Sequence, residues 1–123
     1  MSYAVTVSEP LVAQHALTVP NAGPEGELHS HAFEVEATFH GSELGEDGYL
    51  LDIDDAVAAL ESVLDRYRDE TLNDHLEGNP SCERLAAAVH ADLRASLSAA
   101  AVEELAVTVH EDDAATVTYA APF

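Results

Sequence analysis

The chain has 123 residues, 47% of them hydrophobic, which is enough for one domain around one core (residues 1–123) and too few for two. It contains 24 acidic residues and only four basic ones, all arginine, which gives a formal charge of −20. Such a chain could not neutralise a row of phosphates, so we expect no nucleic-acid partner. No apolar run nears the ~20 residues that cross a bilayer, and MSYAVTVSEP lacks the features of a secretory signal, so we expect a cytoplasmic protein with no membrane partner.

The first part of the chain is predicted to form strands. Residues 3–7 (YAVTV) and 11–17 (LVAQHAL) alternate as strands do, and Pro10 predicts a break or bulge between them. Residues 18–26 (TVPNAGPEG) are typical of a loop. In the next strand, two histidines share one face with a run of apolar residues. That face consists of His29, His31, Phe33, Val35, Ala37 and Phe39.

From about residue 54 the periodicity becomes helical. Five apolar residues recur at helical spacing: Ile53, Val57, Leu60, Leu64 and Tyr67. A second helix is predicted to begin near Ser81, a good N-cap residue, with the lone cysteine, Cys82, as a buried small residue in its first turn. Residues 104–111 and 115–120 are predicted to be two final strands joined by DDA.

The order strands, helix, helix, strands predicts an α+β two-layer sandwich, with the helices covering one face of a mainly antiparallel sheet. A sheet of about four strands has open edges, and we expect oligomerisation to close them. The acids are spread along the chain, which we interpret as the solvated surface of a halophilic protein. Molar salt shortens the Debye length to ~3 Å and would screen their mutual repulsion.

Two histidines one residue apart on a strand project to the same side. His29 and His31 can therefore converge on one ion, at ~2.0–2.1 Å from each nitrogen. A third imidazole from a neighbouring strand would leave one tetrahedral position open, as in catalytic zinc sites. His15 is the best candidate because it also shares a face with apolar residues. The alternative is that the histidines are packing residues, and other divalent ions remain open although neutral imidazoles suit Zn²⁺.

An ordered set of motifs resembles the 6-pyruvoyl- and 6-carboxy-tetrahydropterin synthases. The motifs are LVAQHAL, ELHSHAFEVEATFHG, GYLLDID, LND, NPSCERLA and VTVHEDDAATVTY. The resemblance covers nearly the whole chain. It implies a tunnelling fold, with a four-stranded antiparallel sheet and two helices on one face, whose subunits assemble as trimers or hexamers into a β-barrel with active sites at the interfaces.

The resemblance also implies roles for individual residues. It implies zinc bound by His15, His29 and His31, and a pterin substrate whose amino-pyrimidine edge is held by both carboxylate oxygens of Glu111. Ser81 stands where the family has a substrate-binding threonine, and it is equally suited to cap the helix.

The sequence departs from the synthases at the catalytic base. The cysteine that precedes their H-G-H motif is absent, and GPEGELHSH offers Glu25 and Glu27 instead. The sequence is similar here to a subgroup of the family that has the motif E-x-H-G-H. This resemblance implies a retro-aldol enzyme, which cleaves 7,8-dihydroneopterin triphosphate to 6-hydroxymethyl-7,8-dihydropterin. Glu27 fits that spacing, so hydroxymethyl-dihydropterin formation is preferred over carboxy- or pyruvoyl-tetrahydropterin formation.

A second departure concerns the proton relay. The Asp-His pair that precedes Leu-Asn in the family is missing. Asp69 or Glu70 would therefore have to take over proton transfer, or the side chain of His75 would have to extend to the position of the missing histidine. The altered relay leaves a non-catalytic pterin-binding or assembly subunit as the alternative. A triphosphate substrate would also require arginines, gathered at an interface from Arg66, Arg68 or Arg94.

Overall fold

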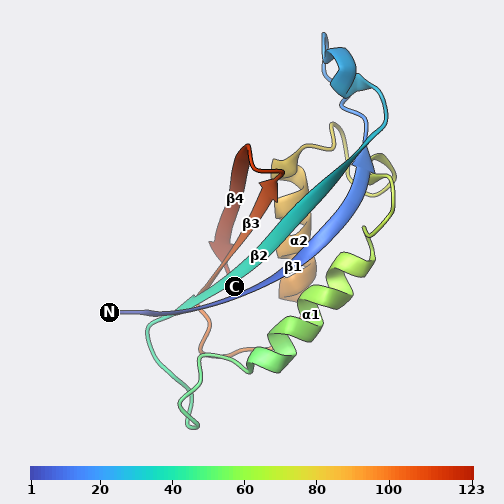
Figure 1. Cartoon of the computed structure of the whole chain (residues 1–123). Helices are drawn as coiled ribbons and strands as arrows, with labels where there is room; N and C mark the ends of the chain where they lie inside the picture. The colour runs from blue at the N-terminus through green and yellow to red at the C-terminus, as the bar shows by residue number, and fades with distance from the viewer.

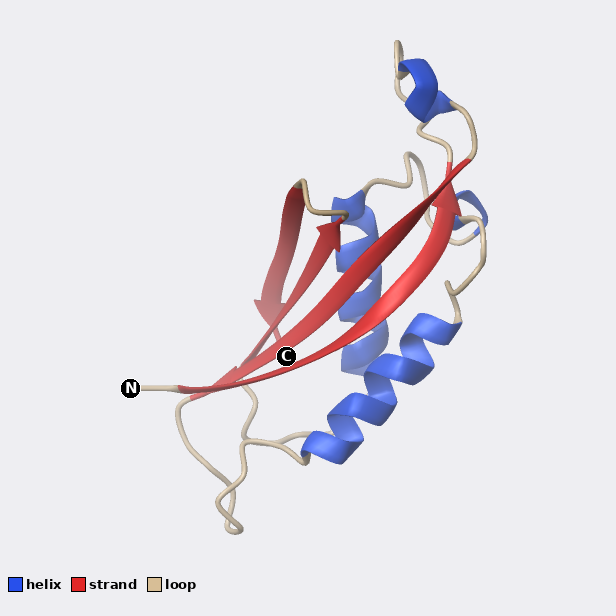
Figure 2. Ribbon diagram, in the orientation of Figure 1, coloured by secondary structure: helices blue, strands red, loops and turns tan.

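The computed structural model describes residues 1–123 and forms a four-stranded sheet covered by two helices (Figure 1). The elements in chain order are β1 (Tyr3–His15), β2 (His29–Gly41), α1 (Ile53–Asp65), α2 (Cys82–Ser96), β3 (Glu104–Glu111) and β4 (Ala115–Pro122). The strands lie in the order β1-β2-β3-β4 and every pair is antiparallel. Both helices pack on the same face of the sheet (Figure 2), which confirms the predicted α+β architecture. None of the helices combines the length and hydropathy that a membrane crossing requires.

The core lies between the sheet and the helices. The inward face of β2 is buried at alternate positions from Phe33 to Phe39, as the period-two pattern predicts. The helices contribute fully buried leucines and a valine, namely Leu60, Leu64, Leu85, Val89 and Leu93. Burial of apolar surface at ~25 cal/mol per Å² is the main force that holds the two layers together.

β1 runs through Pro10 without interruption, so the predicted break there is wrong. The register is continuous from Tyr3 opposite Gly41 to His15 opposite His29. β1 is an edge strand, and a proline is tolerated there because one side of the strand lacks a ladder partner. The Pro10 carbonyl accepts a hydrogen bond from the Arg68 guanidinium at 3.0 Å. The unbroken strand is what brings His15 alongside β2.

α1 forms where the apolar spacing predicts it, but its inward face is slightly rotated. The buried residues are Ala56, Leu60, Val63 and Leu64. Ile53 is 53% exposed and Val57 36% exposed, so these two predicted stripe residues lie at the border of the buried face. Ala56 and Val63, which the predicted stripe does not include, complete the buried face.

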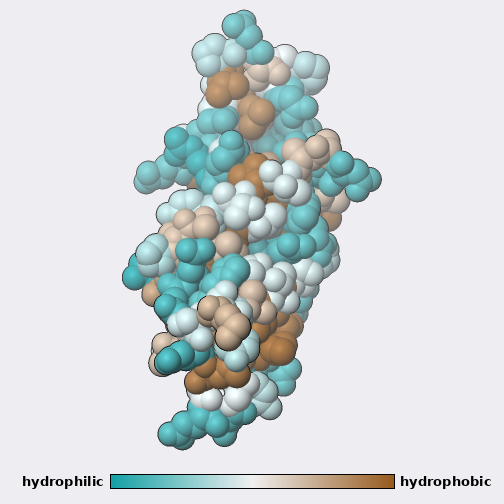
Figure 3. Space-filling view, turned by 90° about the vertical axis from the view of Figure 1, so that its left-hand side faces the viewer, coloured by the Kyte–Doolittle hydropathy of each residue, from teal (hydrophilic) through white to brown (hydrophobic).

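α2 begins as predicted, and its first turn lies at the same end of the molecule as the end of β1. Ser81 is the N-cap, and its Oγ accepts a hydrogen bond from the Arg84 N–H at 3.2 Å. The end of β1, the start of β2, the start of α2 and the β3–β4 turn all lie at the upper end of the view in Figure 1. Hydrophilic residues cover much of the face in Figure 3, with small hydrophobic patches between them.

Candidate metal centre

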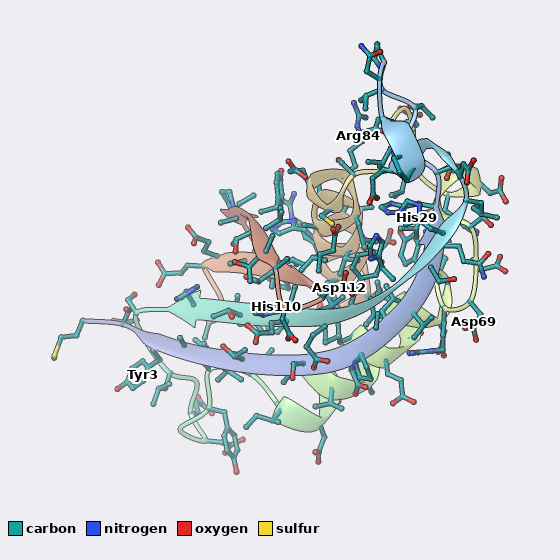
Figure 4. The ribbon with its side chains drawn as sticks, turned by 45° about the horizontal axis from the view of Figure 1, so that its top comes forward. Tyr3, His29, Asp69, Arg84, His110 and Asp112 are labelled. Carbon is teal, nitrogen blue, oxygen red and sulfur yellow. The ribbon has the colours of Figure 1, made fainter.

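Three imidazoles meet where β1 ends and β2 begins. His15 lies opposite His29 in the register, and His31 follows His29 on the same face of β2. The ring centroids are separated by 4.6 Å for His15 and His29, 5.1 Å for His15 and His31, and 4.8 Å for His29 and His31. Figure 4 shows His29 at the start of β2. The structure therefore brings together the three histidines that strand geometry selected.

Each imidazole is oriented by a hydrogen bond at Nδ1. The partners are the Pro80 carbonyl for His15 at 2.8 Å, the Glu27 carbonyl for His29 at 2.7 Å, and the Asp112 carboxylate for His31 at 3.1 Å. Carbonyl and carboxylate oxygens only accept, so each Nδ1 carries the hydrogen and each Nε2 presents a lone pair. All three Nε2 atoms are buried and have no hydrogen-bond partner.

This donor set fits a divalent cation. A buried polar atom without a partner costs about 1–3 kcal/mol, so three such atoms in one place indicate a ligand that satisfies them together. Neutral imidazoles, each fixed in its tautomer by an outer partner, are the usual environment of Zn²⁺. Ligand atoms of the three histidines and Glu25 all lie within 4.8 Å of one another.

Glu25, rather than Glu27, brings its carboxylate to this cluster. Glu25 belongs to the short 3₁₀ helix Gly23–Gly26, and its Oε2 lies 2.9 Å from His29 Nε2. This contact is an ion-pair distance and not a hydrogen bond, so His29 Nε2 still lacks a hydrogen-bond partner. Two atoms that both carry lone pairs need a cation or a proton between them at this distance. Glu27 is exposed and reaches His29 only through its backbone carbonyl.

A cavity of about 210 Å³ opens beside the cluster. His15, Glu25, Ser81, Cys82 and Glu111 are among the residues that line it. The end of β3 and the start of α2 therefore add a carboxylate and a hydroxyl to the space next to the imidazoles. Both substrate-binding residues implied by the resemblance, Glu111 and Ser81, lie in this cavity.

Cys82 holds the carboxylate of Glu111 in place. Its thiol donates a hydrogen bond to Glu111 Oε2 at 2.8 Å. Burial, and then this hydrogen bond and the charge of Glu111, raise the pKa of the Cys82 thiol to about 12. The thiol stays protonated at neutral pH and acts as a donor rather than as a nucleophile.

The raised pKa predicts a slow reaction of Cys82 with alkylating reagents. At pH 8 in molar salt, we expect iodoacetamide to modify the native protein about 10³-fold more slowly than the unfolded chain, because the thiol pKa rises from 9.0 to about 12 on folding. The chain has a single cysteine, so intact mass reports this site alone. Equal rates in the native and unfolded states would contradict the buried donor role.

The same shift predicts how stability depends on pH. A folded pKa above the unfolded value contributes stability below pH 9, and this stability is lost as the pH rises towards about 12. Tyr67 adds to the loss because burial and its hydrogen bond to Asp92 raise its pKa to about 12 as well. Cys82→Ala should make the fall in unfolding free energy over this range less steep.

The proposed relay residues lie outside the cavity lining. Asp69 has a positive φ of 59° in the connection after α1, and its N–H donates to the Val12 carbonyl. Glu70 Oε1 lies 3.2 Å from His75 Nε2. Glu70 and His75 therefore form an acid–histidine pair in the region where the family's pair is missing.

Two features of the site were not identified from the sequence. Asp112 supports His31, and Cys82 binds Glu111. Both contacts join distant elements, so only the register of β3 against β2 and the packing of α2 on β3 could have revealed them.

Comparison with known proteins gives one family and a consistent fold. The chain matches the family model described as 6-pyruvoyl tetrahydropterin synthase over residues 4–122. Comparison with curated proteins finds no match.

Three solved structures illustrate the structural similarity. The Caenorhabditis elegans 6-pyruvoyl tetrahydropterin synthase superposes with a TM-score of 0.82 at 18% identity, over 97% of this chain and 95% of that chain. A Plasmodium vivax 6-pyruvoyltetrahydropterin synthase, in which a catalytic glutamate is replaced by cysteine, has a TM-score of 0.86 at 13% identity, over 100% and 99%. A dihydroneopterin aldolase from Burkholderia thailendensis, bound to guanine, has a TM-score of 0.54 at 12% identity, over 99% and 90%. At these identities the likeness shows the tunnelling fold alone.

Proposed function

Because the chain belongs to the 6-pyruvoyl tetrahydropterin synthase family, we propose that it is a zinc-dependent lyase acting on 7,8-dihydroneopterin triphosphate. The proposed reaction is retro-aldol cleavage of the side chain to 6-hydroxymethyl-7,8-dihydropterin. The observation that carries this proposal is the glutamate carboxylate, 2.9 Å from one of three unpartnered imidazole nitrogens, in a chain with no cysteine near that position. The Plasmodium vivax relative supports it, since a glutamate is named as a catalytic residue there.

His15, His29 and His31 would hold the zinc ion through Nε2. When bound, the ion stabilises negative charge that develops on the side-chain oxygens of the substrate. The carboxylate of Glu25 accepts the proton of the side-chain hydroxyl farther from the pterin ring. The carbon–carbon bond between the two hydroxyl-bearing carbons then breaks, glycolaldehyde triphosphate leaves, and the carbon attached to the pterin takes up a proton.

Other acidic residues and His75 have alternative or additional roles in the proposed proton transfers. Glu27 is the alternative base, because its spacing fits the E-x-H-G-H pattern. The pair of Glu70 and His75 lies outside the cavity of its own subunit, so it is proposed to return the proton across a subunit interface of the oligomer, with Asp69 as the other acid of that region.

Glu111 and Ser81 are proposed to bind the pterin. A carboxylate has four lone-pair positions, and the Cys82 thiol uses only one of them. Glu111 therefore keeps the capacity to accept two parallel N–H groups from an amino-pyrimidine edge. Ser81 keeps an O–H to donate while its oxygen caps α2.

The proposed active unit is a homo-oligomer, a trimer or hexamer closed into a barrel. β1 and β4 are the two open edges of the sheet, and pairing between subunits would remove both. Arg66 and Arg68 are paired with Asp92 and Asp65 within the subunit, so the positive charge that a triphosphate requires would have to be gathered from several subunits on assembly. Sizing in molar salt, with and without zinc, tests this assembly.

Product analysis tests the reaction. The purified protein is incubated with zinc and dihydroneopterin triphosphate in molar salt, and the pterins are separated by chromatography with fluorescence detection. We expect 6-hydroxymethyl-7,8-dihydropterin as the main product. Carboxy- or pyruvoyl-tetrahydropterin would show the alternative synthase reaction, and tight pterin binding without turnover would show a non-catalytic binding subunit.

Matched variants identify the base. Glu25→Gln is expected to lower kcat by about 10²–10⁴-fold, because it removes the proton acceptor next to the cluster. Glu27→Gln should change kcat only a few-fold, since its contact with His29 is made by the backbone. The reverse order of effects would assign the base to Glu27.

A further inference from the structure

We propose that Asp112 is a positioning residue for the metal centre, which orients the His31 ring and strengthens His31 Nε2 as a donor to the cation. This inference rests on the zinc site proposed above. It assigns a role to a residue of the β3–β4 turn that neither the sequence motifs nor the reaction calls for.

His31 differs from the other two imidazoles in the charge of its outer partner. Backbone carbonyls hold His15 and His29, whereas the Asp112 carboxylate lies 3.1 Å from His31 Nδ1. A carboxylate on the far nitrogen fixes the tautomer and increases electron density at the nitrogen that faces the cation. The His31 side chain is 13% exposed and that of Asp112 is 56% exposed, so solvent weakens this effect without removing it.

The backbone of the turn directs Asp112 towards β2. β3 pairs with β2 up to Glu111, opposite Phe33, and the chain then reverses, with the Ala114 N–H bonded to the Glu111 carbonyl at 3.2 Å. Asp112 adopts a φ of +50°, a left-handed conformation that aspartate and asparagine tolerate better than other side chains. Asp113, the next residue, is exposed and forms no ion pair with a histidine.

Both acidic residues at the start of the β3–β4 turn, Glu111 and Asp112, form side-chain contacts with other elements. Glu111 is bound by Cys82 from α2, and Asp112 by His31 from β2. Ligand atoms of His31, Glu111 and Asp112 lie within 4.8 Å of one another, so this short segment links the cavity to the metal centre. The contact of Glu111 with Cys82 and the Ala114–Glu111 backbone hydrogen bond restrain the turn independently of His31, and a positioning residue needs such restraint because a freely moving carboxylate could not hold a ring in one orientation.

Metal affinity tests the proposal without reference to activity. Affinity for Zn²⁺ is measured by competition with a chelating dye in molar salt, and Co²⁺ absorption reports the geometry at the ion. Asp112→Gly removes the carboxylate and suits a positive φ, and we expect it to weaken Zn²⁺ binding by about 10–100-fold. Asp112→Asn keeps an acceptor oxygen and loses only the charge, so its affinity should be intermediate.

Asp113→Asn is the matched control, since it removes the same charge one residue away and should change the affinity by less than about 2-fold. Thermal unfolding of the metal-free proteins shows whether each variant is folded. Equal affinities for Asp112→Gly, Asp113→Asn and wild type would overturn the positioning role and leave the zinc site intact. A wild-type protein that binds neither Zn²⁺ nor Co²⁺ would overturn the zinc site and the positioning role together.

Discussion

Replacement of His15 by alanine is expected to weaken zinc binding by about 10³-fold. The variant loses one of only three protein ligands, and each of these contributes a large part of the free energy of metal binding. His15 is 3% exposed and its Nδ1 is fixed by the Pro80 carbonyl, so its Nε2 is held in place for the cation before the cation binds. The measurement is zinc content after dialysis, together with dye competition. Zinc should also raise the unfolding temperature of the wild type and not that of the variant.

His40→Ala is the control for this experiment. His40 lies on the same strand as His29 and His31 but points to the opposite face of the sheet. It should keep the wild-type zinc content. If His15→Ala and wild type bound equal amounts of zinc, the three imidazoles would be packing residues and the proposed enzyme would lose its basis.

Replacement of Glu111 by glutamine is expected to weaken pterin binding by about 10²-fold. An amide offers one acceptor oxygen and places an N–H₂ donor against the second N–H of an amino-pyrimidine, so one hydrogen bond is lost and one repulsive contact is gained. The dissociation constant is measured from pterin fluorescence in molar salt. Zinc content should remain unchanged, which separates this effect from damage to the metal centre.

Glu104→Gln, at the other end of β3, is the matched control because it removes the same charge from an exposed position. It should leave pterin affinity within about 2-fold of wild type. Equal affinities of Glu111→Gln and wild type would show that the cavity binds the pterin by other groups.

Local periodicity was sufficient to predict the strands, the helices and the meeting of the three histidines. Strand geometry requires His29 and His31 to share a face, and that face also contains the buried residues from Phe33 to Phe39. The break predicted at Pro10 does not occur, because the effect of a proline depends on the position of its strand in the sheet, and the residues around Pro10 do not reveal that β1 lies at the edge.

The residues that line the cavity could not be predicted from local sequence patterns, because contacts between distant segments bring them together. Glu25 and Glu27 have similar surroundings in the sequence, and a short 3₁₀ helix decides which carboxylate approaches His29. Without the family resemblance, the sequence would have indicated no role for Glu111, an acidic residue at the end of a strand. Its hydrogen bond to Cys82 spans two distant elements and emerged only from the packed structure.

The uninterrupted β1 strand has a consequence for the order in which the centre is assembled. All three imidazoles belong to β1 and β2, which are consecutive in the chain, so closing the single connection over residues 16–28 is enough to gather them. The proposed ligand set is therefore complete within the first third of the chain, before either helix begins. The groups that orient two of these rings, the Pro80 carbonyl and the Asp112 carboxylate, come from later parts of the chain, so the ring orientations depend on the whole fold although the ligands themselves do not.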